Sequence, residues 1–348
     1  MAFEPFVWHS NPPADIPFKE SERWKNIRFT GKSRHYPVAD TWYPCWASDG
    51  NLYSPFTDGI TDGRFAKSEI VSHRDENGHL LVDYTTTTCQ ALLEGDNPLD
   101  LKITATELQY ADAFPYAGRY ACGSLVYNGY WYYGTYCLGP YGRTYFGKNM
   151  EHSPDGKAYL VAHGSDLKFY PVALENFTHN SWITGDQIYL IRVTPSPETI
   201  NDPNAYEFYA GKDADGEAIW SNNFEEIQPL LEWQNNMGCV TVTYNAPLKR
   251  YFMTVTDGTT TVSKYNTYIL ECETLTGEWK LVTYMKHFGE EAYFVNFPSK
   301  FISEDGKTMW MCYSANFAKN WTGEPMEANP PDSAYGMVFQ EIQICDIE

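Results

Sequence analysis

The sequence lacks any apolar run near the ~20 residues that a membrane-spanning helix requires. It is also poor in basic residues, with 25 Lys and Arg against 45 Asp and Glu and a formal charge of −20. Nucleic-acid binding and attachment to anionic membranes both depend on basic patches. We therefore expect neither a nucleic-acid partner nor a membrane partner.

Several motifs of cofactor and metal enzymes are missing. There is no phosphate-binding glycine loop followed by a helix, no Ser-centred nucleophile elbow, no H-E-x-x-H and no C-x-x-C. The 8 cysteines are scattered, and most lie in apolar strand patterns. We therefore expect no cofactor and no catalytic metal.

The first residues, Met-Ala-Phe-Glu-Pro-Phe, have neither the charged end nor the apolar stretch of a signal peptide. Two alternatives stay open: a cytosolic protein, or one whose signal segment has been removed.

The composition favours strands over helices. Aromatic residues make up 16% of the chain, Tyr alone numbers 27, and charged residues are only 20%. From Asp40 onward a strand, a polar turn and a second strand recur five times, with Asp49-Gly50, Asn128-Gly129, Asp155-Gly156 and Asp305-Gly306 at four of the turns. Repeated inner strand pairs are typical of propellers. We predict an all-β, five-bladed β-propeller over residues 36–348, with a Pro-rich lead-in over 1–35 packed on it.

The second blade departs from this pattern. Only residues 138–144 separate the second hairpin from the third, too few for two outer strands. We expect this blade to be thin or to borrow strands from elsewhere.

The first hairpin brings two carboxylates together if its loop is Ser48-Asp49-Gly50, because Asp40 then faces Asp58. Opposed residues have Cβ atoms roughly 4.5–5.5 Å apart, about the carboxyl spacing of retaining glycosidases, roughly 5–5.5 Å. A two-residue loop would place them on opposite faces. The residues alone also leave open that both are ordinary strand-end and turn aspartates.

The stretch Asp-Thr-Trp-Tyr-Pro from Asp40, with Trp-Ala-Ser-Asp-Gly-Asn-Leu-Tyr-Ser from Trp46 and Thr-Asp-Gly from Thr57, resembles the opening blade of a known family. This is a glycoside-hydrolase-like five-bladed propeller family that includes the bacterial endo-D-arabinanases. The resemblance spans roughly residues 38 to 317. It implies a glycosidase whose paired aspartates are Asp40 and Asp58, a carbohydrate substrate with arabinan-type furanose units, and a secreted or periplasmic location.

The strand ends predicted to ring one mouth of the propeller carry polar side chains that could bind substrate: Arg119, Lys148, Asn149, His163, Asp257 and Glu291. Trp42 and Trp46 are candidate platforms for sugar rings, or core residues packed between blades. Glu151 is an alternative catalytic acid, or a channel-lining glutamate.

Each of these residues also has a purely structural interpretation. Asp257 precedes a glycine and could be a turn former, and Glu291 adjoins Glu290 in a doublet of the kind that is usually solvated. His163 is better explained as a hydrogen-bonded channel histidine than as a metal ligand. A structural Ca²⁺ or Na⁺ in a central channel stays open, although no oxygen-ligand loop is readable.

The sequence therefore favours a retaining glycoside hydrolase with two catalytic carboxylates. Two alternatives remain: a non-catalytic propeller that binds glycans or proteins, and a polysaccharide lyase. A lyase would need a base near a neutralised uronate, and Arg119 and His163 leave that open.

Overall fold

The computed structural model describes residues 3–68, 71–83, 85–112, 120–136, 149–152, 155–164, 181–260, 262–319, 323 and 325–347. Within these residues nearly all regular structure is strand. The helical elements of the described residues are α2 (Ser181–Thr184) and three short 3-10 turns, η1 (Pro203–Ala205), η2 (Phe224–Glu226) and η3 (Ser299–Phe301), besides a single helical residue at Lys319. None of the helices described is long and apolar enough to span a membrane.

Five antiparallel sheets follow one another along the chain. The first contains β3 (Cys45–Trp46), β4 (Leu52–Phe56), β9 (Thr85–Glu94) and β10 (Lys102–Asp112). The second contains, within the described residues, β11 (Tyr120–Tyr127) and β12 (Tyr130–Tyr136). The third contains β13 (Asn149–His152), β14 (Ala158–Gly164), β15 (Gln187–Val193), β16 (Glu207–Lys212) and β17 (Ala218–Ser221), with β18 (Leu231–Glu232) beside β15.

The fourth and fifth sheets follow along the chain, together with two small hairpins. The fourth contains β19 (Gly238–Asn245), β20 (Arg250–Asp257), β21 (Asn266–Cys272) and β22 (Lys280–Met285). The fifth contains β23 (Tyr293–Asn296), β24 (Thr308–Ser314), β25 (Met337–Asp346), β2 (Trp24–Tyr36) and β1 (Phe6–Val7). Two separate hairpins, β5 (Gly59–Thr61) with β6 (Arg64–Ala66) and β7 (Val71–Arg74) with β8 (Leu80–Asp83), belong to the first blade by sequence.

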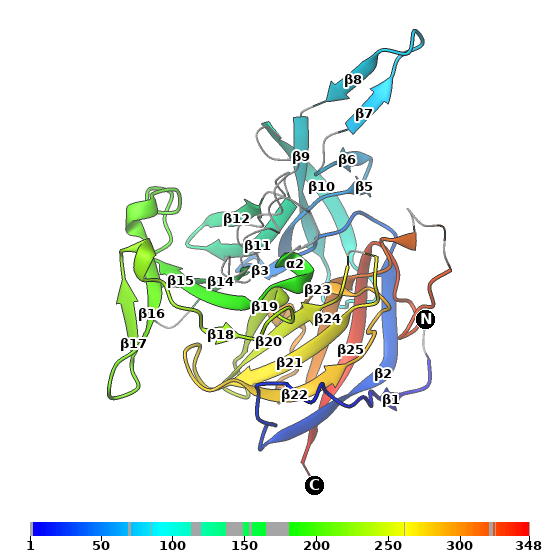
Figure 1. The fold of residues 1–348 in the computed structure, drawn as a ribbon. Coiled ribbons are helices and arrows are strands. Elements are labelled where there is room, and N and C mark those ends of the chain that lie inside the picture. Colours follow the sequence, from blue (N-terminus) through cyan, green and yellow to red (C-terminus); the bar gives the residue numbers. More distant parts are fainter. Residues whose placement is uncertain are drawn as a thin grey trace.

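The first strand of each sheet packs against its neighbours around an axis (Figure 1). Strand β11 contacts β3 and β4, β13 contacts β11, β19 contacts β13 and β14, and β23 contacts β19. The turn η3, which follows β23, contacts β3 and closes the ring. The fold is therefore the five-bladed β-propeller that the sequence predicts, and within the described residues its second blade is thin.

The last blade joins the two ends of the chain. Strand β2 pairs with β25 from Trp24, opposite Asp346, to Tyr36, opposite Met337. Strand β1 adds to the outer side of β2. The segment expected as a lead-in over residues 1–35 thus supplies two strands of the fifth blade.

The first inner hairpin turns as expected. The Ala47 N–H donates to the Asn51 carbonyl at 2.9 Å, and Gly50 has a φ of +85°, which favours glycine. Residues that precede the turns of the first, second and fourth inner hairpins line one cavity, so these three turns share one end of the propeller, here named the turn end. The opposite end, where Asp40 and Asp58 lie, is named the carboxyl end.

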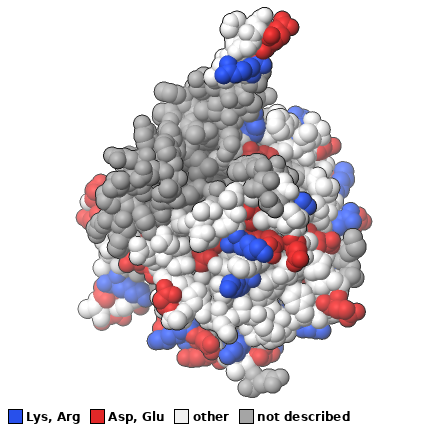
Figure 2. Space-filling model, turned by 45° about the vertical axis from the view of Figure 1, so that its right-hand side comes forward, with Lys and Arg blue, Asp and Glu red and all other residues white. Residues whose placement is uncertain are grey.

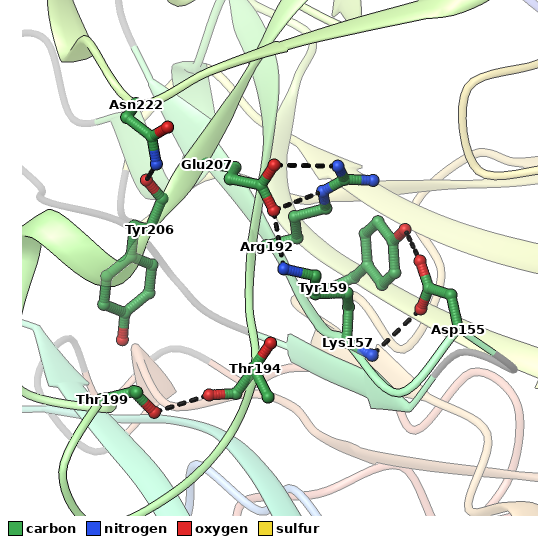
Figure 3. A network of polar contacts seen from close by, with 9 residues as sticks. All are labelled: Asp155, Lys157, Tyr159, Arg192, Thr194, Thr199, Tyr206, Glu207 and Asn222. Carbon is green, nitrogen blue, oxygen red and sulfur yellow. Dashed lines mark hydrogen bonds and ion pairs between the residues drawn. The ribbon is translucent and has the colours of Figure 1, made fainter.

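The outer surface combines ion pairs with a projecting arm. Hairpin β7–β8 stands out from the body in Figure 1, and Figure 2 shows acidic and basic side chains interspersed over the described part of one face. On the third blade, Glu207 accepts from Arg192 Nε at 3.0 Å and from Lys157 Nζ at 2.8 Å, which links β15, β16 and the turn before β14 (Figure 3). The guanidinium of Arg192 also lies 4.0 Å from the centre of the Trp220 ring.

A large apolar cluster holds the joining strand in place. Phe29, on β2, is fully buried, and its ring centre lies 5.1 Å from that of Phe6 and 5.9 Å from that of Phe288. We expect Phe29→Ala to lower the free energy of unfolding by about 3–5 kcal/mol, because a large buried ring is removed. Urea denaturation would measure this, with the exposed neighbour Arg28→Ala as control. Equal stability of the two variants would show that β2 does not hold the ring together.

Candidate functional site

Asp40 lies where the chain enters the first blade. It forms an antiparallel bridge with Thr57, whose carbonyl accepts the Asp40 N–H at 2.9 Å. The expectation that Asp40 faces Asp58 directly is therefore wrong by one residue. The cause lies between Asp40 and β3, where Thr41 has a φ of +62° and the Tyr43 N–H donates to the Ser54 hydroxyl instead of a strand carbonyl.

The Asp40 carboxyl is enclosed by protein. Its side chain is buried, Thr41 Oγ1 donates to Oδ1 at 2.8 Å, and the Tyr293 hydroxyl donates to Oδ2 at 2.7 Å. Burial raises the pKa of this carboxyl well above its usual range, and the negative charge of Asp58 raises it further. Asp40 therefore keeps its proton at pH values where an exposed aspartate has lost it.

Asp58 has a different environment. It follows Thr57 directly with a φ of +50° and is only partly buried. The Ser68 N–H donates to its Oδ1 at 2.8 Å, and the Ser68 hydroxyl donates to Oδ2. The Tyr335 hydroxyl donates to its backbone carbonyl. Donors aimed at both carboxylate oxygens favour the charged form. The site thus joins a buried carboxyl that tends to be neutral with a neighbour that is stabilised as an anion.

An aromatic cluster borders this pair. Trp182, on α2, is stacked on Phe294 at a ring-centre distance of 6.2 Å and meets Tyr293 edge-on at 6.0 Å. Phe317 packs edge-on against Tyr293 at 5.5 Å. None of these residues was predicted from the sequence, because nothing in the local pattern indicates that the side chains of α2 and β23 meet. Their apolar rings strengthen the electrostatic interactions of the Asp40 carboxyl.

The Glu290-Glu291 doublet is not solvated, contrary to expectation. Glu291 is fully buried, and its Oε2 accepts the Ala318 N–H at 3.0 Å. Glu290 is also buried and forms an ion pair with Lys264 Nζ at 2.5 Å. Burial raises the pKa of Glu291 to about 7, and the Glu290 charge adds to the effect.

Asp257 and His163 are both buried at strand ends. Asp257 ends β20 and accepts from Asn266 Nδ2 at 2.5 Å and from the Tyr268 hydroxyl, both across on the β21 side. Burial raises the pKa of Asp257 to about 6. His163 lies near the end of β14 and is 1% exposed. The structure thus holds Asp257 within the fourth blade by bonds to its own neighbours.

The two candidate tryptophan platforms, Trp42 and Trp46, lie in different environments. Trp42 is 1% exposed; its ring stacks on Phe56 at 4.9 Å, and its Nε1 donates to the Ala39 carbonyl at 2.6 Å. The expectation of a sugar platform at Trp42 is wrong, because both its ring and its N–H are used in the core. Trp46 is 50% exposed, but it adjoins the 48–50 loop at the turn end, away from Asp40.

Four further candidate site residues lie wholly, or with their side chains, outside the described residues. Arg119 and Lys148 lie outside the described residues, and so do the side chains of Asn149 and Glu151, whose backbones form part of β13. Among the residues that the structure does describe, no group of three or more His, Cys, Asp or Glu is arranged to hold a metal ion.

No protein-family model matches the sequence, and no curated protein matches it. Among solved structures, the chain is similar to a Bacteroides ovatus ATCC 8483 protein whose description as a hydrolase is provisional. The TM-score is 0.51 at 11% identity, over 95% of this chain and 93% of that one. The two proteins share their fold.

Two further structures are less similar. One is a thermostable family-43 glycoside hydrolase, with a TM-score of 0.44 and 14% identity over 91% of each chain. The other is an alpha-L-arabinofuranosidase from Lactobacillus brevis, with a TM-score of 0.30 and 12% identity over 91% of this chain and 83% of that one. Scores at this level support no inference about the site.

The buried Glu291 carboxyl predicts a pH-dependent stability. Its pKa is raised in the folded protein, so folding favours the protonated form, and stability is lost as pH rises through about 7. We expect Glu291→Gln to gain roughly 1–3 kcal/mol relative to the native protein at pH 8, and much less at pH 4.5. Urea denaturation at both pH values would test this. The same difference at both would show that Glu291 does not titrate in this range.

Proposed function

We propose that the protein is a glycoside hydrolase that cleaves a polysaccharide or oligosaccharide with arabinan-type furanose units. The observation that carries the proposal is the pair Asp40 and Asp58, two adjacent carboxyls with opposite environments. Glycosidic cleavage needs one protonated and one ionised carboxyl beside the scissile bond. A polymeric substrate of this kind favours a secreted or periplasmic location.

In the proposed mechanism Asp40 is the acid and Asp58 the nucleophile. The Asp58 carboxylate attacks the anomeric carbon while Asp40 transfers its proton to the leaving glycosidic oxygen. The Asp40 carboxylate then takes a proton from water, the hydroxide attacks the anomeric carbon, and the bond to Asp58 breaks. Anomeric configuration is retained, and Asp40 is protonated again for the next cycle.

Tyr293 is assigned a positioning role. Its hydroxyl donates to Oδ2 of Asp40, which fixes the carboxyl against the fifth blade. Thr41 holds the other oxygen. When Asp40 is ionised after proton transfer, these two donors stabilise the charge until the water step restores the proton.

The described neighbours of the pair argue against a lyase. A lyase must neutralise the carboxylate of a uronate, whereas the contacts described for Asp40 and Asp58 include the hydroxyls of Thr41, Tyr293 and Ser68, the Ser68 N–H and the second carboxyl. A non-catalytic glycan-binding propeller would not need Asp40 to keep a proton in a buried environment.

The pair can be tested by isosteric neutralisation. We expect Asp40→Asn and Asp58→Asn each to lower kcat/KM on an arabinan-type substrate by at least about 10²–10⁴-fold. Melting temperatures should change little, because asparagine has nearly the shape of aspartate and the hydroxyls around the pair can accept from its amide as well as donate to it. The matched control is Asp215→Asn, an exposed aspartate on the β16–β17 turn. Unchanged turnover in both site variants, or loss of fold with loss of activity, would refute the assignment.

The stereochemical course provides a separate test. We expect the first-formed product to keep the anomeric configuration of the substrate, because in the proposed mechanism Asp58 attacks the anomeric carbon from one face and water later displaces Asp58 from that same face. Proton NMR of the nascent product anomer would measure it. An inverted product would contradict the nucleophilic role of Asp58 and make Glu151 or Asp257 the next candidates.

A further inference from the structure

The cavity at the turn end of the propeller lies apart from the two carboxyls. Its volume is about 260 Å³, and it is lined by residues of β3, β11 and β19 and of the segment from β23 to η3. These lining residues come from the parts of the inner strands nearest the turns, whereas Asp40 precedes the first inner strand. The cavity, here named the turn-end pocket, is therefore distinct from the carboxyl pair.

The lining of the turn-end pocket is polar but uncharged. Among the described residues that form it there is no Asp, Glu, Lys, Arg or His. An ionic ligand would lose its hydration here without gaining a counter-charge. The protein as a whole carries a formal charge of −20, which further disfavours anions. A neutral ligand fits this environment.

The floor of the pocket presents hydrogen-bond acceptors. Asn296 uses both amide hydrogens on backbone carbonyls, those of Trp42 at 3.0 Å and Phe294 at 2.9 Å, so its Oδ1 remains the atom able to accept. Thr243 likewise donates its hydroxyl to the Phe297 carbonyl at 2.9 Å and keeps accepting capacity. Both side chains are only 7% exposed, so they are fixed in place. A ligand rich in hydroxyl donors complements them.

The rim supplies aromatic surface. Trp46 is 50% exposed, and Tyr244 is held by ring contact with Tyr251 at 4.8 Å. Indole and phenol rings combine an apolar face with a polar edge, so they suit ligands with both kinds of surface. The volume lies below the roughly 300–1,000 Å³ of sites for drug-sized molecules, which limits the occupant to about one ring.

We infer that the turn-end pocket binds a single sugar unit of a neutral polysaccharide, with Trp46 as the stacking platform and Asn296 and Thr243 accepting from sugar hydroxyls. This second site is not needed for hydrolysis. It would keep the protein attached to a polymer while the carboxyl end acts on another part of it or on another chain. The inference concerns binding alone and stands or falls independently of the proposed reaction.

Affinity electrophoresis tests this directly. Native gels would contain debranched arabinan, xylan or mannan as neutral probes, and polygalacturonate as an anionic one. The protein would carry Asp58→Asn, so that no probe is consumed. We expect retardation by at least one neutral polymer and none by polygalacturonate. Adding Trp46→Ala should raise the apparent Kd at least tenfold, while Trp46→Phe, which keeps an aromatic face, should restore part of the affinity.

The matched control is Phe224→Ala, which removes an aromatic ring of equal exposure, 50%, from the outer part of the third blade. It should leave retardation unchanged. In the otherwise native protein, Trp46→Ala should leave kcat and KM on a short aryl glycoside unchanged, because such a substrate occupies only the carboxyl end. The inference is overturned if no neutral polymer retards the protein, if polygalacturonate does so more strongly, or if Trp46→Ala behaves like Phe224→Ala.

Discussion

The pairing of β2 with β25 is the interaction on which the rest of the molecule depends. Each blade packs on its two neighbours, so the ring closes only where the fifth blade meets the first. Here the fifth blade is completed by strands from both ends of the chain, which fixes its position against the first. The Asp40–Tyr293 hydrogen bond crosses this same junction, and so does the bond from Asn296 to the Trp42 carbonyl.

The two ends of this junction differ in chemistry. At the carboxyl end, a buried acid, an anion held by Ser68 and a group of packed aromatic rings create a strong local field. At the turn end, the lining is uncharged, and the aromatic surface at Trp46 is open. A field that holds a proton on one carboxyl suits bond cleavage, whereas a neutral pocket with a fixed polar floor suits retention of a ligand.

The sequence could predict what depends on local turn chemistry and strand periodicity. The loop at Gly50 and the number of blades follow from turn residues that recur between strand-forming stretches. It could not predict that Thr41 adopts a positive φ and shifts Asp40 opposite Thr57, since a single irregular residue before a strand leaves no pattern. It also could not decide between Trp42 and Trp46, because both lie in the same aromatic stretch and only the packing of Phe56 separates them.

The contribution of both chain ends to one blade has a consequence for synthesis in the cell. Strand β2 is synthesised long before β25, so the fifth blade stays incomplete until β25 has left the ribosome. Until then the blade that carries Tyr293 is incomplete, and the Asp40 carboxyl is not yet held by it. Pairing across nearly the whole length of the chain also makes the closing step slow compared with hairpin formation. The enclosed environment of the Asp40 carboxyl would therefore form only after β25 has been synthesised.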